Sequence, residues 1–187
     1  MSFMYRSNVE LTLDECRQIL LAVDERDTEK LIETVLSARR VFFAGVGRVM
    51  LSLKSVAKRF AHIGIECHIV GEITEPAIGK EDVLIAASGS GESLFPKEIA
   101  KKAKSIGAKV VMIGSNREST LAKTADFMVR VPTNTKMKCE DEIKSRQIMT
   151  SLFEQFLLLY GDIIARIIVT RNNIDIDSLW DCHANLE

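Results

Sequence analysis

One segment restricts the fold of this chain more than any other. A short apolar run from Val83 to Ala87 leads directly into the small residues Ser88-Gly89-Ser90-Gly91. Such a run has the length and composition of a buried strand. After Glu92 the apolar residues recur at helical spacing, with lysines mostly on the other side. The segment therefore predicts a strand, a tight turn and a helix. In an open parallel sheet, this turn lies at the carboxyl end of a strand, where ligands bind.

The residues of this turn indicate an anion site. Its glycines allow a ligand to approach the backbone closely, and Ser88, Ser90 and Ser93 supply hydroxyl groups. The following helix adds unpaired N–H groups and the positive end of its dipole. A phosphate suits such a site. The lysine of a nucleotide-binding P-loop is missing, which favours a phosphorylated metabolite. The alternative is an ordinary turn in which a serine caps the helix.

Further apolar runs of strand length alternate with helical patterns along the chain. This alternation predicts an α/β domain with a parallel sheet and right-handed crossovers. We expect a single domain over residues 1–187, with its sheet core at about 41–132. The expected strands cover residues 41–45, 67–71, 83–88, 109–115 and 127–132. The expected helices between them cover 49–63, the segment that follows Glu92 and ends at Gly107, and 119–125.

A helical cover is expected before the first strand, at about residues 8–38. Thr12 is followed three residues later by Glu15, which resembles a capping box at a helix start. The charged residues from Asp24 to Lys30 are expected to form a turn between two helices. This region either covers the sheet or contacts another subunit.

The turn after the first strand reads Gly45-Val46-Gly47-Arg48. It resembles the start of a dinucleotide fingerprint, but Met50 occupies the position of the third glycine. An ordinary tight turn between strand and helix is at least as good an interpretation. Arg48 either reaches a phosphate bound in the neighbouring turn or is solvated.

A long helix at about residues 146–170 is expected to precede a C-terminal tail. It is apolar around most of its circumference, so it must be buried on several sides. Either another subunit or the N-terminal helices of the same chain can cover it. Glu154 stands in this helix among Leu152, Phe153 and Phe156. Apolar surroundings raise the pKa of a carboxyl group, which suits a general base or acid. The alternative is a glutamate that turns outward or pairs with an arginine such as Arg146.

Composition excludes several classes of protein. The formal net charge of −1 gives no general attraction to nucleic acids or membranes. The most apolar stretch, from Phe156 to Val169, is too short to span a bilayer. The cysteines are scattered and show no metal-ligand spacing, which fits free thiols in a reducing cytoplasm. No signal peptide is visible at the N-terminus.

The remaining polar features have ordinary interpretations. Residues 133–144 are expected to form a mobile surface loop able to close over a site, and Glu140-Asp141-Glu142 within it a solvated run rather than a metal site. His62 and His68 are expected to be structural, and His183 to be an exposed histidine of the tail.

Several motifs together resemble the 6-phospho-3-hexuloisomerases, which belong to the sugar isomerase (SIS) domain superfamily. The resemblance extends from the N-terminal helix to the last residue. The serine turn is shared by the superfamily, whereas the helix motif around Glu154 and the terminal motif are more specific. The matching motifs are Gly45-Val46-Gly47-Arg48, Phe60-Ala61-His62-Ile63-Gly64, Val70-Gly71-Glu72, Ser88-Gly89-Ser90-Gly91-Glu92-Ser93, Phe153-Glu154-Gln155 and His183-Ala184-Asn185-Leu186-Glu187.

The resemblance implies a three-layer, flavodoxin-like fold: a five-stranded parallel sheet with extra N- and C-terminal helices. It also implies a homotetramer or dimer without cofactor or metal. The implied activity interconverts 3-hexulose 6-phosphate and fructose 6-phosphate, a step of the ribulose monophosphate pathway. A non-catalytic phosphosugar-binding module and an isomerase of a different phosphosugar are the alternatives.

The resemblance also implies roles for individual residues. It assigns Glu154 as the base that moves a proton through an enediol, and His183 as an aid to ring opening or proton shuttling, in its own or a neighbouring subunit. Phosphate binding falls to the matching turn, and three more residues match family positions. The phosphate ligands are Ser88, Gly89, Ser90 and Ser93, and the three further positions are Arg48, His62 and Glu72.

Two departures from the family pattern bear on the substrate. Val49 stands where the family usually has a serine, which removes one hydroxyl from the expected phosphate site. Losing a hydrogen bond to a charged group costs about 1.5–3 kcal/mol. The family's Gln-Pro-Met-Gly is here Gln147-Ile148-Met149-Thr150, which changes the helix entry near the proposed base. The exact sugar therefore stays open.

Overall fold

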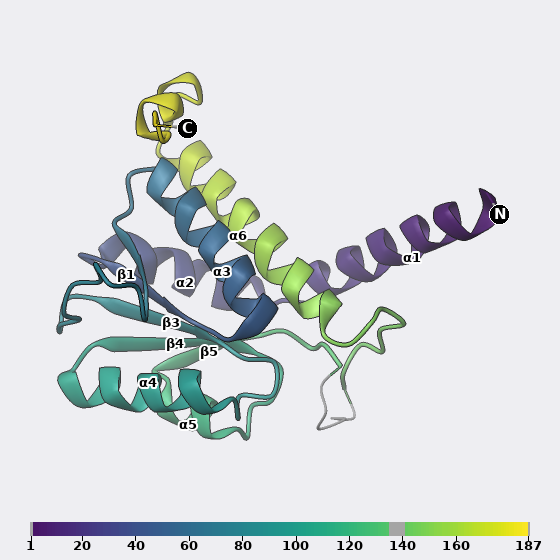
Figure 1. Cartoon of the computed structure of the whole chain (residues 1–187), viewed down its shortest axis with the longest axis horizontal. Coiled ribbons are helices and arrows are strands. Elements are labelled where there is room, and N and C mark those ends of the chain that lie inside the picture. Colours follow the sequence, from purple (N-terminus) through teal and green to yellow (C-terminus); the bar gives the residue numbers. More distant parts are fainter. Residues whose placement is uncertain (1, 135–140, 187) are drawn as a thin grey trace.

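The computed structural model describes residues 2–134 and 141–186. Its elements alternate between strand and helix after an N-terminal pair of helices (Figure 1). In chain order they are α1 (Ser2–Leu21), α2 (Glu25–Ser37), β1 (Val41–Ala44), α3 (Gly47–His62), β2 (Cys67–Ile69), β3 (Val83–Ala87), α4 (Leu94–Ile106), β4 (Lys109–Gly114), α5 (Thr120–Thr124), β5 (Phe127–Arg130), α6 (Ser151–Arg171) and the 3-10 helix η1 (Asp177–Cys182).

The strands form one five-stranded sheet in the order β2-β1-β3-β4-β5. Every neighbouring pair is parallel, and Ala44 of β1 lies opposite Ala86 of β3. This strand order is that of flavodoxin-like folds, and the predicted fold class is confirmed. The chain leaves β1 toward β2 on one side and later enters β3 on the other. The carboxyl ends of β1 and β3 therefore flank the point where the strand order reverses.

The sheet separates two apolar cores, because successive side chains of a strand point to opposite faces. Phe43 and Ile85 pack with α2, α3 and α6 on one face. Phe42 and Leu84 pack with α4 and α5 on the other. Figure 1 shows α4 and α5 below the sheet and the larger helical layer above it. The expected three layers are thus present, with both faces of the sheet covered.

Helix α6 packs against α3, α1 and α2, which explains its nearly continuous apolar surface. Its crossing with α3 is close at Gly161, where an added Cβ would lie 2.4 Å from Cγ2 of Val56. Packing within one chain therefore buries most of the apolar surface of α6. Leu158, Leu159 and Ile163 remain about 40% exposed.

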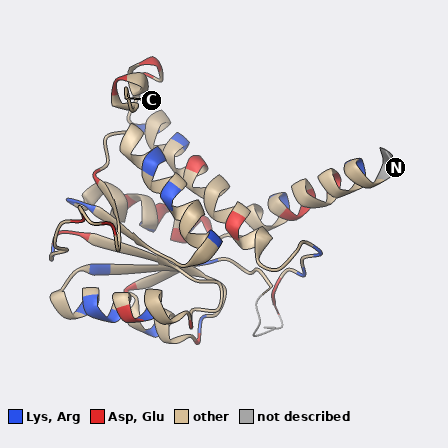
Figure 2. Cartoon of the chain, viewed as in Figure 1, with Lys and Arg blue, Asp and Glu red and all other residues tan. Residues whose placement is uncertain are grey.

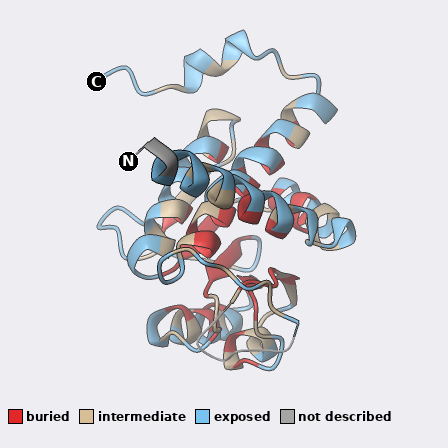
Figure 3. Cartoon of the chain, turned by 90° about the vertical axis from the view of Figure 1, so that its right-hand side faces the viewer, coloured by how far each residue is buried: buried red, intermediate tan, exposed pale blue. Residues whose placement is uncertain are grey.

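The N-terminal region differs from the expectation in two respects. α1 runs without interruption from Ser2 through Thr12, so the predicted capping box is wrong. Glu15 is instead buried and accepts hydrogen bonds from a distant segment. α2 begins at Glu25, with Asp24 accepting a hydrogen bond from the Arg26 N–H at 2.8 Å, so most of the expected turn is helical. The first half of α1 extends away from the body of the molecule (Figure 1), and residues 4–8 within it are exposed (Figure 3).

The long C-terminal helix begins at Ser151 rather than at about residue 146. The segment before this helix is bound to Glu15 of α1 instead of being helical. The Glu15 carboxylate accepts hydrogen bonds from Ser145 Oγ at 2.6 Å and from the Arg146 N–H at 2.9 Å. Met149 then adopts a φ of +54°, which α-helices of L-residues do not contain. The tertiary contact thus replaces the first turn of the predicted helix.

Figure 2 shows basic and acidic residues distributed over most helices, with several basic residues along α4. None of the described helices is both long and apolar enough to cross a membrane.

Candidate active site

The turns after β1 and β3 lie side by side, because the two strands are parallel neighbours in the sheet. With the start of α6 and residues 133–134 they enclose a pocket of about 600 Å³. The site residues predicted from the two turns and from α6 are therefore brought together. The pocket is lined by Val46, Gly47, Arg48, Val49, Ala87, Ser88, Gly89, Ser90, Ser93, Thr133, Asn134, Ile148, Met149, Thr150, Ser151, Phe153 and Glu154.

The serine turn is held by its own hydroxyl groups. Ser88 is buried, and its Oγ lies 3.0 Å from Oγ of Ser93 and accepts from the Gly91 N–H at 3.1 Å. Ser90 Oγ accepts from the Glu92 N–H at 3.3 Å. Ser93 precedes α4 but makes no side-chain capping bond. Its hydroxyl therefore stays beside that of Ser88 at the helix N-terminus, where an anion is favoured.

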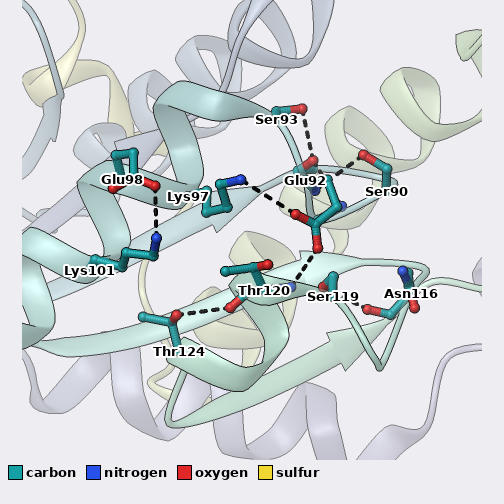
Figure 4. Close-up of polar contacts among 12 residues, drawn as sticks. Ser90, Glu92, Ser93, Lys97, Glu98, Lys101, Asn116, Ser119, Thr120 and Thr124 are labelled. Atoms are coloured by element: carbon teal, nitrogen blue, oxygen red, sulfur yellow. Dashed lines mark hydrogen bonds and ion pairs between the residues drawn. The ribbon is translucent and has the colours of Figure 1, made fainter.

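The turn requires a glycine at position 91. Gly91 has a φ of +69°, and an added Cβ would lie 2.1 Å from Oγ of Ser119. Glu92 is not among the residues that line the pocket, and it accepts from the Thr120 N–H at 2.6 Å (Figure 4). This hydrogen bond holds the pKa of the Glu92 carboxyl below its usual value. The Glu92–Thr120 hydrogen bond thus attaches the serine turn to α5.

The Glu154 carboxylate is buried at the pocket wall, with 7% of the residue exposed. Its Oε1 accepts from Thr150 Oγ1 at 2.8 Å, and its Oε2 pairs with Arg48 Nε. The Ser52 hydroxyl donates to its backbone carbonyl at 2.8 Å. The expected apolar surroundings are present, because the buried Phe153 lines the pocket together with Val46, Val49, Ile148 and Met149. The carboxylate itself has polar partners.

An arginine does pair with Glu154, but it comes from α3. Arg146 is engaged through its backbone N–H with Glu15 instead. The Arg48 side chain is 68% exposed, and it lines the same pocket as the serine turn. A guanidinium in this position can reach either a carboxylate or a bound phosphate.

Three predicted residues lie away from the pocket within this chain. His62 ends α3 and stacks on His183 with ring centroids 5.2 Å apart. Arg48 and His62 are fourteen residues apart on α3, a separation of about 21 Å at 1.5 Å per residue. Glu72 follows β2 and pairs with Lys54 at 3.2 Å. One chain therefore does not combine His183 with Glu154.

The tail and the acidic run follow the sequence-based interpretations only in part. The tail packs on the end of α3 through His183, while Trp180 is 71% exposed. Asp141 pairs with Arg130 at 2.6 Å rather than being only solvated. Residues 135–140, half of the expected mobile loop and including Glu140, lie outside the described residues.

Sequence reasoning missed the role of Thr150 beside Glu154. Thr150 was recognised only as a departure from the family pattern. The four-residue spacing of the pair was the available signal, because such residues are neighbours on a helix. Thr133 and Asn134 also line the pocket, but no motif or spacing in the sequence indicated that they would. Within the part of the chain that the structure describes, no cluster of three His, Cys, Asp or Glu residues could hold a metal ion.

A model of the SIS domain family matches residues 34–159, which include the sheet, the serine turn and Glu154. This chain belongs to the SIS domain family. The resemblance drawn from the sequence is confirmed at this level.

Relatives of known name extend the similarity beyond the SIS domain. A 3-hexulose-6-phosphate isomerase of Bacillus subtilis is 37% identical over 94% of this chain and 95% of its own length. One from Mycobacterium gastri is 35% identical over 97% of this chain and 90% of its own. A Methanococcus jannaschii protein, whose crystal structure was used to infer the same function, has a TM-score of 0.81 at 28% identity, over 97% and 99% of the two chains.

Proposed function

We propose that this SIS protein is a sugar-phosphate isomerase that interconverts 3-hexulose 6-phosphate and fructose 6-phosphate. The observation that carries the proposal is that the serine turn and the Glu154 carboxylate line one pocket. A phosphate site beside a buried carboxylate fits a phosphorylated substrate that undergoes proton transfer. The relatives named 3-hexulose-6-phosphate isomerase, which match nearly the whole chain, support this choice of sugar.

The phosphate is bound by Ser88, Gly89, Ser90 and Ser93 at the N-terminus of α4. Two observations support this assignment: the adjacent hydroxyls of Ser88 and Ser93, and the absence of a side-chain cap on the helix. Arg48 turns from Glu154 to the phosphate when the substrate enters, since its side chain is largely exposed. Charge-assisted hydrogen bonds of this kind are strong.

Glu154 then acts as the base. Its carboxylate takes the proton from the hydroxyl-bearing carbon beside the sugar carbonyl, and the electron pair of that C–H bond forms the C=C bond of an enediolate, with the negative charge on the former carbonyl oxygen. The proton of the neighbouring hydroxyl then passes to that oxygen. The same carboxyl returns the proton to the former carbonyl carbon, which moves the carbonyl by one position. No net proton is consumed. A general base in this position contributes about 10²–10⁴-fold to the rate.

The protein is a homotetramer with one domain per chain, and it works in the cytoplasm. The distance between His183 and its own pocket supports an assembly in which His183 serves a neighbouring subunit. Exposed apolar residues on α1 and α6 support a subunit contact, among them Leu13, Leu158 and Ile163. Free thiols at Cys16, Cys67 and Cys182 fit a reducing compartment.

The test is deuterium incorporation from solvent into a panel of phosphosugars. Glu154→Gln should reduce exchange into 3-hexulose 6-phosphate by about 10²–10⁴-fold, while phosphosugar affinity is kept. Glu98→Gln, on the exposed side of α4, is the matched control and should leave exchange unchanged.

Three other outcomes would replace the proposal. Unchanged exchange in Glu154→Gln would remove the proposed base. Tight binding without exchange by the wild type would favour a non-catalytic binding module. Exchange confined to another phosphosugar would favour an isomerase of that sugar.

A further inference from the structure

Thr150 stands at the N-cap position of α6, but its side chain does not cap the helix. A threonine in this position normally accepts a hydrogen bond from one of the first helical N–H groups. Here its hydroxyl donates to Oε1 of Glu154 at 2.8 Å. Its backbone carbonyl still accepts from the Phe153 and Glu154 N–H groups at 3.0 and 3.2 Å. The hydroxyl thus serves the carboxylate and not the helix.

The two donors on the Glu154 carboxylate differ in how firmly they are fixed. Arg48 reaches Oε2 from α3 with a long side chain that is 68% exposed. The Thr150 hydroxyl is more firmly fixed, because rotation about a single side-chain bond sets the position of its oxygen. Thr150 also stands one helical turn before Glu154 in the same segment. A phosphate in the serine turn competes for the guanidinium of Arg48. It does not compete for the hydroxyl of Thr150, whose acceptor is the carboxylate itself.

The backbone that carries Thr150 is itself held in place. The preceding residue, Met149, has a φ of +54°, a conformation that a non-glycine residue adopts at a cost. Ser145 and Arg146 tie the same segment to the buried carboxylate of Glu15 on α1. Ser52 of α3 binds the backbone carbonyl of Glu154 at 2.8 Å. The donor and the acceptor are therefore both anchored to the rest of the fold.

We propose that Thr150 is a positioning residue for the Glu154 carboxylate, an inference that rests on the proposed function. It holds Oε1, so that Oε2 faces the sugar once Arg48 has turned to the phosphate. Thr150 keeps its own proton throughout, because the transferred proton passes from one substrate carbon to Oε2 and from there to the former carbonyl carbon.

The experiment compares Thr150→Val, Thr150→Ala and Thr150→Ser in the full-length protein. Valine keeps the branched shape but cannot donate, and serine restores the hydroxyl. Both non-donating variants should lose about tenfold to hundredfold in kcat, the usual effect of a slightly misplaced reacting group. Their KM for 3-hexulose 6-phosphate should change less than twofold to threefold, and Thr150→Ser should recover most of the loss.

Thr124→Val is the matched control. Thr124 on α5 also donates across four residues, to the Thr120 carbonyl at 2.8 Å, and it lies on the other face of the sheet (Figure 4). It should change neither kcat nor KM. Thermal unfolding of all variants separates a loss of folded protein from a loss of positioning.

Two results would overturn the inference. If the wild type exchanges deuterium and Thr150→Val keeps its kcat, or if Thr150→Ser is as slow as Thr150→Ala, Thr150 does not position the base. If the wild type shows no exchange with any phosphosugar, the proposed function fails and the inference fails with it.

Discussion

Two buried carboxylates, those of Asp82 and Glu154, are held by arginines in different ways. Asp82 lies before β3 and accepts from the Arg39 and Arg40 guanidinium groups and from the Gly79 N–H, at 2.7–3.3 Å. All of its acceptor positions are used, and its side chain is fully buried. Glu154 has one exposed arginine and one hydroxyl, and it opens on a pocket. Asp82 is therefore suited to stability and Glu154 to chemistry.

Asp82→Asn should destabilise the fold by about 3 kcal/mol at pH 7, because both arginines lose their buried counter-charge. Burial raises the pKa of the Asp82 carboxyl, but its hydrogen bonds with Arg39, Arg40 and Gly79 together lower it to about 2. A lowered pKa contributes stability that is present above the unfolded value, about 3.9, and is lost as the pH falls through about 2. Urea unfolding of the wild type and of Asp82→Asn between pH 7 and pH 2 measures the difference in the free energy of unfolding and its loss at low pH.

The neighbouring Glu81→Gln is the control for this prediction. The Glu81 side chain is 77% exposed and lies 3.9 Å from Arg39, so its replacement should change the free energy of unfolding by less than about 0.5 kcal/mol. An Asp82→Asn variant as stable as Glu81→Gln at pH 7 would contradict the argument.

At the scale of elements, the crossing of α3 and α6 determines where the pocket residues stand. α3 carries Arg48 and Ser52, and α6 carries Glu154, so the packing of the two helices sets the distance between these groups. Gly161 lies at the point of close contact with Val56. A glycine inside a helix costs about 1 kcal/mol relative to alanine, which the close packing must offset.

Gly161→Ala should therefore be destabilising by about 1–3 kcal/mol despite the better helix propensity, because the new methyl overlaps the Val56 side chain. Val56→Ala in the same chain should recover part of the loss by making room. Chemical denaturation of the two single variants and the double variant gives the coupling energy. A Gly161→Ala variant more stable than the wild type would show that the helices separate without cost.

At the scale of the whole molecule, the chain carries its proposed catalytic groups at opposite ends of α3. Glu154 and Arg48 stand at its N-terminus, and His183 stacks on His62 at its C-terminus. α1 also extends away from the body of the molecule (Figure 1), with Met4, Tyr5 and Leu13 more than 60% exposed. These features fit a chain whose site and surface are completed by further copies.

Mixing subunits tests whether His183 acts in another copy. Glu154→Gln and His183→Ala should each be nearly inactive alone. When the two are refolded together, random pairing leaves about one site in four with both residues intact, so about a quarter of the wild-type activity should return. Steady-state isomerase assays before and after mixing measure the recovery. If the mixture is no more active than the two variants alone, each pocket uses only its own chain.

The sequence by itself determined the parallel sheet, the serine turn and the family, because these depend on local hydrophobic period and on turn chemistry. Only the tertiary structure decided how the site is assembled. Arg48 and Glu154 are 106 residues apart, and Glu15 shortens α6 from 130 residues away. No local pattern encodes contacts of this range, since they follow from how the helices pack on the sheet. For the same reason the sequence could not show that His183 and Glu154 lie at opposite ends of α3, far from one another in one chain.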